Sequence, residues 1–450
     1  MTALGRSLGP GTLPARWRLA YPAGALILAI GGAALGYTLS THPPPLSLVV
    51  AACIGLSAIL ALAIARYEVA VALGVLLLGV VRFEPAPPDA IFAVVIAVAV
   101  VTGRLDLERV PLGILAILAS FFTLNIFSAV EAVDPGRAML YMMITLYLIV
   151  FSVWFAGYAN SADRVRTVVK AYILGATLMA LYSTMALFLP VPSRELFLFG
   201  DLLRAQGLFE DPNVYGPFLV PAALILLEEL INPRLILWRP TVKTLTIFIL
   251  VMGITFSYSR AAWVNMVIAA LVMLGILALR RGGSRRALTV LVVLSVGGVI
   301  AFTIVSATGS VGFLQERATL QSYDTDRFAA QRTGIELAFQ KPFGIGPGQF
   351  EIISPVATHS TYVRALAEQG LLGFFLVLSL LLGTLILATR NAFVGRDSYG
   401  IGSAALLGAW IGILVNSAVV DSGHWRHLWF VAALIWVGAL RHRRDPFFAA

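Results

Sequence analysis

The chain has 450 residues, of which 59% are apolar and only 12% are charged, and its formal net charge is +9. A water-soluble globular protein carries about a quarter charged residues, so this sequence cannot cover its own surface with polar groups. The composition therefore excludes a soluble protein, and the single cysteine, Cys53, excludes a disulfide framework.

Apolar runs long enough to cross a hydrocarbon core of about 30 Å recur along the whole chain. They predict an all-α integral membrane protein with about fourteen spans, within a range of 12 to 14. The first run continues without a small-residue cleavage site, so we expect it to remain attached. The predicted spans are 22–40, 46–65, 67–82, 88–103, 110–130, 139–158, 167–189, 214–231, 242–258, 261–279, 287–305, 370–389, 401–419 and 427–440.

The Lys and Arg residues predict the orientation of these spans. If the N-terminus is cytoplasmic, most of the 32 Lys and Arg residues fall in cytoplasmic segments, as the positive-inside rule requires. Both termini are then cytoplasmic. The positive charge is explained by topology and by membrane lipids of anionic character, so no nucleic-acid partner is expected.

The polar residues outside the spans divide the chain into three parts. Residues 1–165 are expected to form a transmembrane scaffold, 166–440 a transmembrane region that contains the candidate functional residues, and 441–450 a cytoplasmic tail. Two long segments of the second part, 190–213 and 306–369, are predicted to lie on the outer side.

The first outer segment ends in Arg204-Ala-Gln-Gly-Leu-Phe-Glu-Asp-Pro-Asn213. Asp211 and Asn213 flank a proline and have good turn chemistry, and Asn213 is a plausible helix cap. A turn alone does not explain Arg204, because positive charge is rare in short segments on this side.

Arg260 lies in Thr255-Phe-Ser-Tyr-Ser-Arg-Ala-Ala-Trp263, which joins two spans with almost no loop. An unpartnered guanidinium costs roughly 2.5 kcal/mol at the centre of a membrane helix, and less near its ends, so an anionic group is expected beside it. The partner is either a carboxylate, with Glu210, Asp211 and Asp421 as candidates, or a phosphate ligand held by the planar guanidinium.

The long segment 306–369 is expected to fold on the membrane surface. Asp326 can cap an interfacial helix that runs to about Phe339, and the prolines and glycines of 341–348 then build turns. Ser360 or Thr361 can cap a short helix that leads into the next span.

His359 stands at the mouth of that short helix. It is either a polar residue that hydrogen-bonds the neighbouring backbone or a general base, since histidine exchanges a proton near neutral pH.

Metal and cofactor chemistry has little support in the sequence. Asp324-Thr-Asp326 is formally an acid pair, but it also fits a helix cap, and His424 and His427 lack a clear third ligand for zinc. We therefore expect neither a metal nor a cofactor.

Four ordered motifs carry a family resemblance. They are RAQGLFEDPN (204–213), SYSRAA (257–262), GIGPGQF with HSTYVRALAEQG (344–350 and 359–370), and DSGHWRHLW (421–429). The set resembles the superfamily of O-antigen ligases and O-antigen polymerases over about residues 165–440. The resemblance rests on the order of the motifs, on their spacing and on their shared position on the predicted outer side of the membrane. The resemblance implies a GT-C-like membrane fold in the bacterial inner membrane, with the active site facing the periplasm.

The resemblance also implies residue roles. Arg204 and Arg260 would bind the pyrophosphate of a polyprenyl pyrophosphate-linked glycan donor, and His359 would deprotonate the hydroxyl of a lipid or glycan acceptor. Asp211, Asn213, Arg364 and Asp421 would support them. The family often has Asn after the histidine, where this chain has Ser360. The implied reaction is metal-independent and inverting, because a pyrophosphate leaving group needs cationic stabilisation more than a proton donor.

Other functions remain open on the sequence alone. The chain could be a ligase or a polymerase, since only acceptor recognition separates the two. A flippase for lipid-linked oligosaccharides would need charged residues inside the spans and two similar halves, neither of which is clear. A non-catalytic scaffold that binds the carrier is the third alternative.

Overall fold

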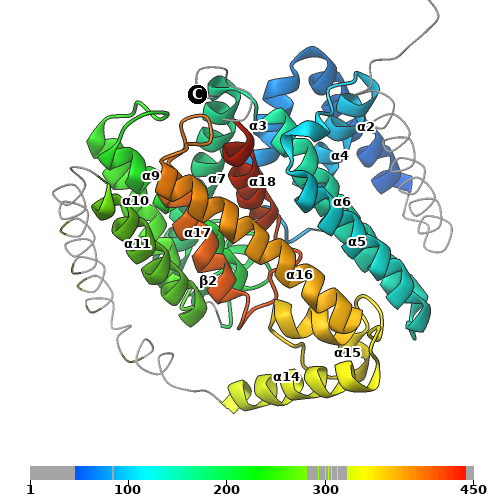
Figure 1. Cartoon of the computed structure of the whole chain (residues 1–450). Helices are drawn as coiled ribbons and strands as arrows, with labels where there is room; N and C mark the ends of the chain where they lie inside the picture. The colour runs from blue at the N-terminus through cyan, green and yellow to red at the C-terminus, as the bar shows by residue number, and fades with distance from the viewer. Residues whose placement is uncertain are drawn as a thin grey trace, which may run out of the picture.

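The computed structural model describes residues 46–83, 86–201, 203–280 and 322–441, together with a few single positions between 281 and 321. Helices make up most of these stretches (Figure 1), which confirms the all-α class. The predicted spans 22–40 and 287–305 and the end of the tail lie outside the described stretches.

The long helices coincide with the predicted spans within the described stretches. They are α2 (Leu46–Ala65), α3 (Tyr67–Leu76), α4 (Pro87–Val101), α5 (Leu112–Ser128), α6 (Pro135–Tyr158), α7 (Ala162–Phe188), α9 (Pro212–Ile231), α10 (Pro240–Phe256), α11 (Arg260–Leu279), α16 (Thr361–Val394), α17 (Ser403–Asn416) and α18 (Arg426–Arg441).

Six helices in the described part are long and apolar enough to cross a membrane by themselves, and six shorter apolar helices accompany them. This confirms a multi-pass membrane protein. The total of fourteen spans and the GT-C-like arrangement stay predictions.

Helix α11 packs closely against α17. The contact depends on small residues, because a Cβ added to Gly408 would lie 2.4 Å from the carbonyl oxygen of Ala269. Small residues allow membrane helices to approach at this distance. The pair supports the site described below, which begins at the first residue of α11.

Figure 1 shows α14 (Ser322–Gln340) and α15 (Phe350–Ile353) at the end of the bundle opposite the last turn of α18. We call this end the α14 face. Helix α14 begins at Ser322, so the prediction that Asp326 caps it is wrong: Asp326 lies exposed inside the helix. Phe328, Ile335 and Phe339 are 59%, 42% and 73% exposed. The position of α14 at the membrane interface stays a prediction.

The segment before α9 forms α8 (Arg194–Phe197) and a small antiparallel hairpin of β1 (Leu198–Phe199) and β2 (Arg204–Ala205). Asp211, and not Asn213 as expected, caps α9, because its carboxylate accepts a hydrogen bond from the Asn213 amide at 2.8 Å. The hairpin places Arg204 beside the end of α10.

Helix α16 consists of two helical parts separated at Gly370, whose φ is +68°. Ser360 caps the first part by accepting a hydrogen bond from the Val363 amide. The expected short helix that leads into the span is therefore confirmed.

Candidate functional site

Residues 257–259 form the turn that joins α10 to α11, so the connection is as short as the sequence predicted. Ser259 caps α11 by accepting a hydrogen bond from the Ala262 amide at 3.3 Å. Tyr258 is buried with a φ of +48°, which is unusual for a residue other than glycine. Backbone strain of this kind is found preferentially at functional sites. The turn fixes Arg260 at the first position of its helix.

Arg204 and Asn213 both bind this turn. The Nε of Arg204 donates to the Ser257 carbonyl at 3.0 Å, and its Nη2 donates to the Tyr258 carbonyl at 3.4 Å. Ser259 Oγ donates to Asn213 Oδ1 at 2.8 Å. The first two motifs are thus joined into one structure, in which Arg204 is 8% exposed.

The guanidinium of Arg260 binds a carboxylate on α14, which lies outside the four motifs. Its Nη2 lies 2.8 Å from both carboxylate oxygens of Asp324 on α14. The expectation of an anionic neighbour is confirmed, but the residue is not one of the three carboxylates proposed from the sequence. Asp324, considered above for metal binding, is instead a ligand of arginine.

A cleft of about 420 Å³ opens beside this ion pair, and we call it the Arg260 cleft. It lies between the first turn of α11, the first half of α14 and the end of α17. Its lining residues are Asn213, Arg260, Ala261, Val264, Asp324, Arg327, Phe328, Gln331, Val415, Asn416, Ala418, Val419 and Val420. A cleft with two arginines and apolar walls suits a ligand that has an anionic head and an apolar tail.

His359 lies in the loop that precedes α16 and has a φ of +45°. The backbone of Thr361, two residues later, is bonded to the end of α17, where its amide donates to the Ser417 carbonyl at 2.9 Å. Ser417 follows Asn416 of the Arg260 cleft, so the histidine loop adjoins the cleft.

The charges around His359 come from the first, third and fourth motifs and from α14. Burial lowers the pKa of His359 below its ordinary value; Arg327 and Arg364 lower it further, whereas Asp211 and Asp421 raise it. The neutral imidazole is therefore favoured near neutral pH, which is the form that a general base needs.

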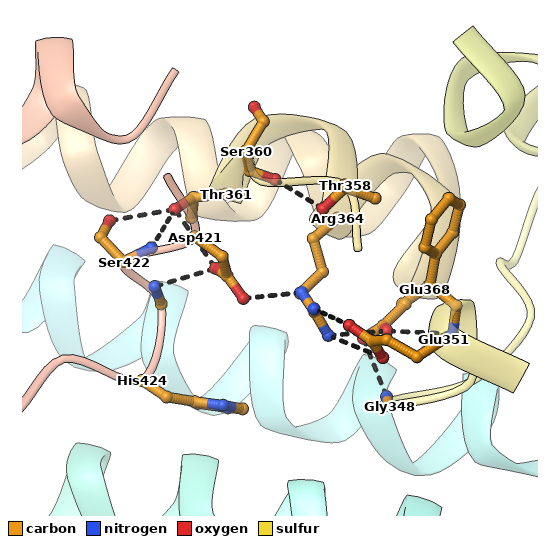
Figure 2. Close-up of polar contacts among 12 residues, drawn as sticks. Gly348, Glu351, Thr358, Ser360, Thr361, Arg364, Glu368, Asp421, Ser422 and His424 are labelled. Atoms are coloured by element: carbon orange, nitrogen blue, oxygen red, sulfur yellow. Dashed lines mark hydrogen bonds and ion pairs between the residues drawn. The ribbon is translucent and has the colours of Figure 1, made fainter. Parts of the chain in front are cut away.

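Arg364, expected as a supporting residue, lies in the middle of a buried ion-pair network (Figure 2). Its guanidinium lies 2.6 Å from Asp421 on one side and pairs with Glu351 and Glu368 on the other. Three carboxylates surround Arg364, and its pair with Asp421 joins the loop of the third motif to the loop of the fourth.

Glu368 extends this network to the glycine-rich loop. Its carboxylate accepts hydrogen bonds from the amides of Gly348 at 2.9 Å and Phe350 at 3.3 Å. The loop also lies against the backbone of α16: a Cβ on Gly344, where φ is +84°, would lie 2.2 Å from the Glu368 carbonyl oxygen. This close approach explains why the motif needs glycine.

A smaller cavity of about 80 Å³ lies against the same network and is lined by Tyr141, Thr145, Arg364, Glu368, Asp421 and His424 among others. Burial lowers the pKa of His424 to about 4, although Asp421 acts to raise it. Burial raises the pKa of Asp421, but Arg364 and His424 outweigh this effect and the pKa lies below its usual range. At neutral pH this part of the network is a neutral histidine beside a carboxylate.

Several residues of the site were missed by sequence reasoning. Arg327 and Asn416 line the Arg260 cleft, and Glu351 and Glu368 bind Arg364. Glu368 lies one helical turn after Arg364, a spacing that could have indicated the pair. The contributions of Arg327 and Asn416 depend on how α14 and α17 pack, which no local pattern reveals.

No three histidine, cysteine or acidic side chains converge as a metal site within the described residues. Asp324 and Asp326 also differ in environment, since the first pairs with Arg260 and the second is exposed.

Comparison with known proteins gives one informative match. Residues 245–378 match the family model described as O-antigen ligase, a region that includes Arg260, Asp324, His359 and Arg364. A search of curated proteins finds no match. The family supports a general role in glycan transfer during O-antigen assembly, and with the membrane helices it indicates a multi-pass protein of the inner membrane. The matched region contains the second and third motifs, so the match agrees with the resemblance of the four motifs to the O-antigen ligase and polymerase superfamily.

Proposed function

We propose that the protein transfers glycan from a polyprenyl pyrophosphate-linked donor, such as an undecaprenyl pyrophosphate glycan, to an acceptor hydroxyl on the periplasmic face. The observation that carries the proposal is the Arg260 cleft, in which an arginine already binds an oxyanion, the carboxylate of Asp324. A phosphate oxygen can occupy the same position.

The residue roles follow from this arrangement. Arg260 binds the donor pyrophosphate, and Arg204 is close to it because it bonds the same turn. Asp211 and Asn213 hold the start of α9 against this turn, while Arg364 and Asp421 fix the loop of His359.

The chemistry needs one base and a stabilised leaving group. His359 accepts the proton of the acceptor hydroxyl, and the oxygen then forms a bond to the anomeric carbon from the side opposite the pyrophosphate. The bond between the anomeric carbon and the phosphate oxygen breaks, and the arginines stabilise the negative charge of the departing carrier pyrophosphate. Configuration is inverted, and no step requires a metal.

The arginine and lysine distribution supports a periplasmic site with both termini in the cytoplasm. The donor half of the site would be the same in a ligase and a polymerase. The acceptor is expected to contact residues of 306–358 and 190–203.

Reconstitution in proteoliposomes tests the function class. The protein is supplied with a purified polyprenyl pyrophosphate glycan and candidate acceptors in EDTA, and release of the carrier pyrophosphate is measured with the length of the product. Long repeating products indicate a polymerase, and a single transfer to a lipid acceptor indicates a ligase. Movement of the donor across the bilayer without release would support the flippase, and binding without release or movement would support the scaffold.

A further inference from the structure

Two buried asparagines lie at the contact between α11 and α17. Asn265 on α11 and Asn416 at the end of α17 are each 1% exposed. Within the described part of the chain, neither the oxygen nor the nitrogen of either amide has a hydrogen-bond partner. Buried side-chain amides almost always have partners, so these two need an explanation.

The two side chains differ in what they face. Asn416 lines the Arg260 cleft together with Arg260 and Arg327. Asn265 faces the backbone of α17, because a Cβ added to Gly412 would lie 2.0 Å from its Oδ1. Among the described side-chain amides with an atom that lacks a hydrogen-bond partner, only Asn416 lines the Arg260 cleft.

The chemistry of the amide indicates the kind of ligand. An asparagine side chain presents two N–H donors and one carbonyl acceptor together. A phosphate oxygen accepts hydrogen bonds and repels the carbonyl, whereas a sugar hydroxyl both donates and accepts. The amide therefore complements a sugar, while Arg260 complements the phosphates.

We infer that Asn416 binds hydroxyl groups of the donor sugar attached to the pyrophosphate, and so helps to determine which sugar is accepted. The inference rests on the proposed function, because it places the pyrophosphate at Arg260 in the same cleft. A buried amide that is satisfied only by the correct ligand discriminates strongly against ligands without the matching hydroxyl.

A purely structural explanation is available for comparison. Asn265 faces Gly412, and Gly412 and Asn416 are one helical turn, about 5–6 Å, apart on α17. Asn265 and Asn416 are therefore separated by about one turn along the helix contact. A modest rotation would let Asn265 and Asn416 bond each other across the two helices, which is a known role of amides in membranes. The experiment must separate this pairing from ligand binding.

The test measures affinity for farnesyl pyrophosphate and for farnesyl pyrophosphates that carry one hexose or one N-acetylhexosamine. The proteins are wild type, Asn416→Leu, Asn265→Leu and Arg260→Ala in detergent. Asn265→Leu is the matched control from the same interface. If Asn416→Leu does not fold, Asn416→Ala gives the same comparison.

We expect at least one glycosylated probe to bind wild type more tightly than farnesyl pyrophosphate. Asn416→Leu should lose that gain, on the order of tenfold, with unchanged affinity for farnesyl pyrophosphate, whereas Asn265→Leu should keep it. The inference is overturned if no sugar improves binding, if Asn416→Leu keeps the gain, or if both variants lose it equally. Failure of the proposed function has a different signature, namely farnesyl pyrophosphate affinity that does not depend on Arg260.

Discussion

Arg260 at the start of α11 and Asp324 on α14 form an ion pair in which one guanidinium nitrogen lies 2.8 Å from both carboxylate oxygens. The pair connects the hairpin of the second motif to α14, which belongs to the long segment predicted to lie outside the membrane. A carboxylate that occupies the place proposed for a phosphate must compete with the donor.

Replacing Asp324 by asparagine should tighten binding of a polyprenyl pyrophosphate. The substitution removes the competing negative charge and nearly preserves shape, so we expect affinity for farnesyl pyrophosphate to rise severalfold, equivalent to about 1 kcal/mol. Calorimetric titration in detergent provides the measurement. Glu336→Gln is the control, since it removes a carboxylate from an exposed pair with Arg332 on the same helix. Equal effects of the two substitutions would mean that net charge alone is responsible.

Arg204→Lys should impair the site even though the charge is kept. Arg204 reaches two carbonyl groups with two different nitrogens of a planar group, and a lysine ammonium cannot reproduce that geometry. Loss of one charge-assisted hydrogen bond costs about 1.5–3 kcal/mol, so the melting temperature should fall together with donor affinity. Normal stability and affinity in Arg204→Lys would show that the two backbone contacts are unimportant.

The pH dependence of transfer should follow the charges around His359. Neutral His359 is the active form, so the rate should rise with pH through the pKa of this histidine, which lies below its ordinary value. Arg327→Gln removes a charge that lowers the pKa, and the rise should move to higher pH. Asp211→Asn keeps the cap of α9 but removes a charge that raises the pKa, and the rise should move to lower pH. Rate profiles from pH 5 to 8 give both midpoints, and shifts in the same direction would argue against His359 as the base.

Gly344→Ala should disturb the glycine-rich loop far more than Gly395→Ala. Both glycines have positive φ, but a Cβ at Gly395 meets open space, whereas one at Gly344 would collide with the Glu368 carbonyl. The shared backbone strain costs about 1–2 kcal/mol, and the collision adds about 1–3 kcal/mol at Gly344 only. Thermal unfolding compares the two variants, and hydrogen exchange across 345–354 shows whether the loss is local. Equal destabilisation would mean that the loop can move away without cost.

The sequence predicted the helices and the motif residues because these depend on local patterns. Apolar run length identified the described spans within a few residues, and Arg204, Asn213 and Arg260 do meet at one turn. The partner of Arg260 was not predicted, because Asp324 is 64 residues away and reaches the turn only through the packing of α14. The predicted helix caps at Asp326 and Asn213 were wrong for a different reason. Each lies two residues after an aspartate, and capping propensity alone does not choose between two such candidates.

The most direct test of the account separates binding from chemistry at the two proposed residues. Donor affinity and single-turnover glycan transfer are measured side by side for wild type, His359→Ala and Arg260→Ala, with folding checked for each variant. The account predicts that His359→Ala binds the polyprenyl pyrophosphate glycan like wild type but transfers about 10²-fold more slowly or worse, and that Arg260→Ala binds poorly. A His359→Ala protein that transfers at the wild-type rate would contradict the assignment of the base, and an Arg260→Ala protein with full affinity would contradict the assignment of the pyrophosphate site.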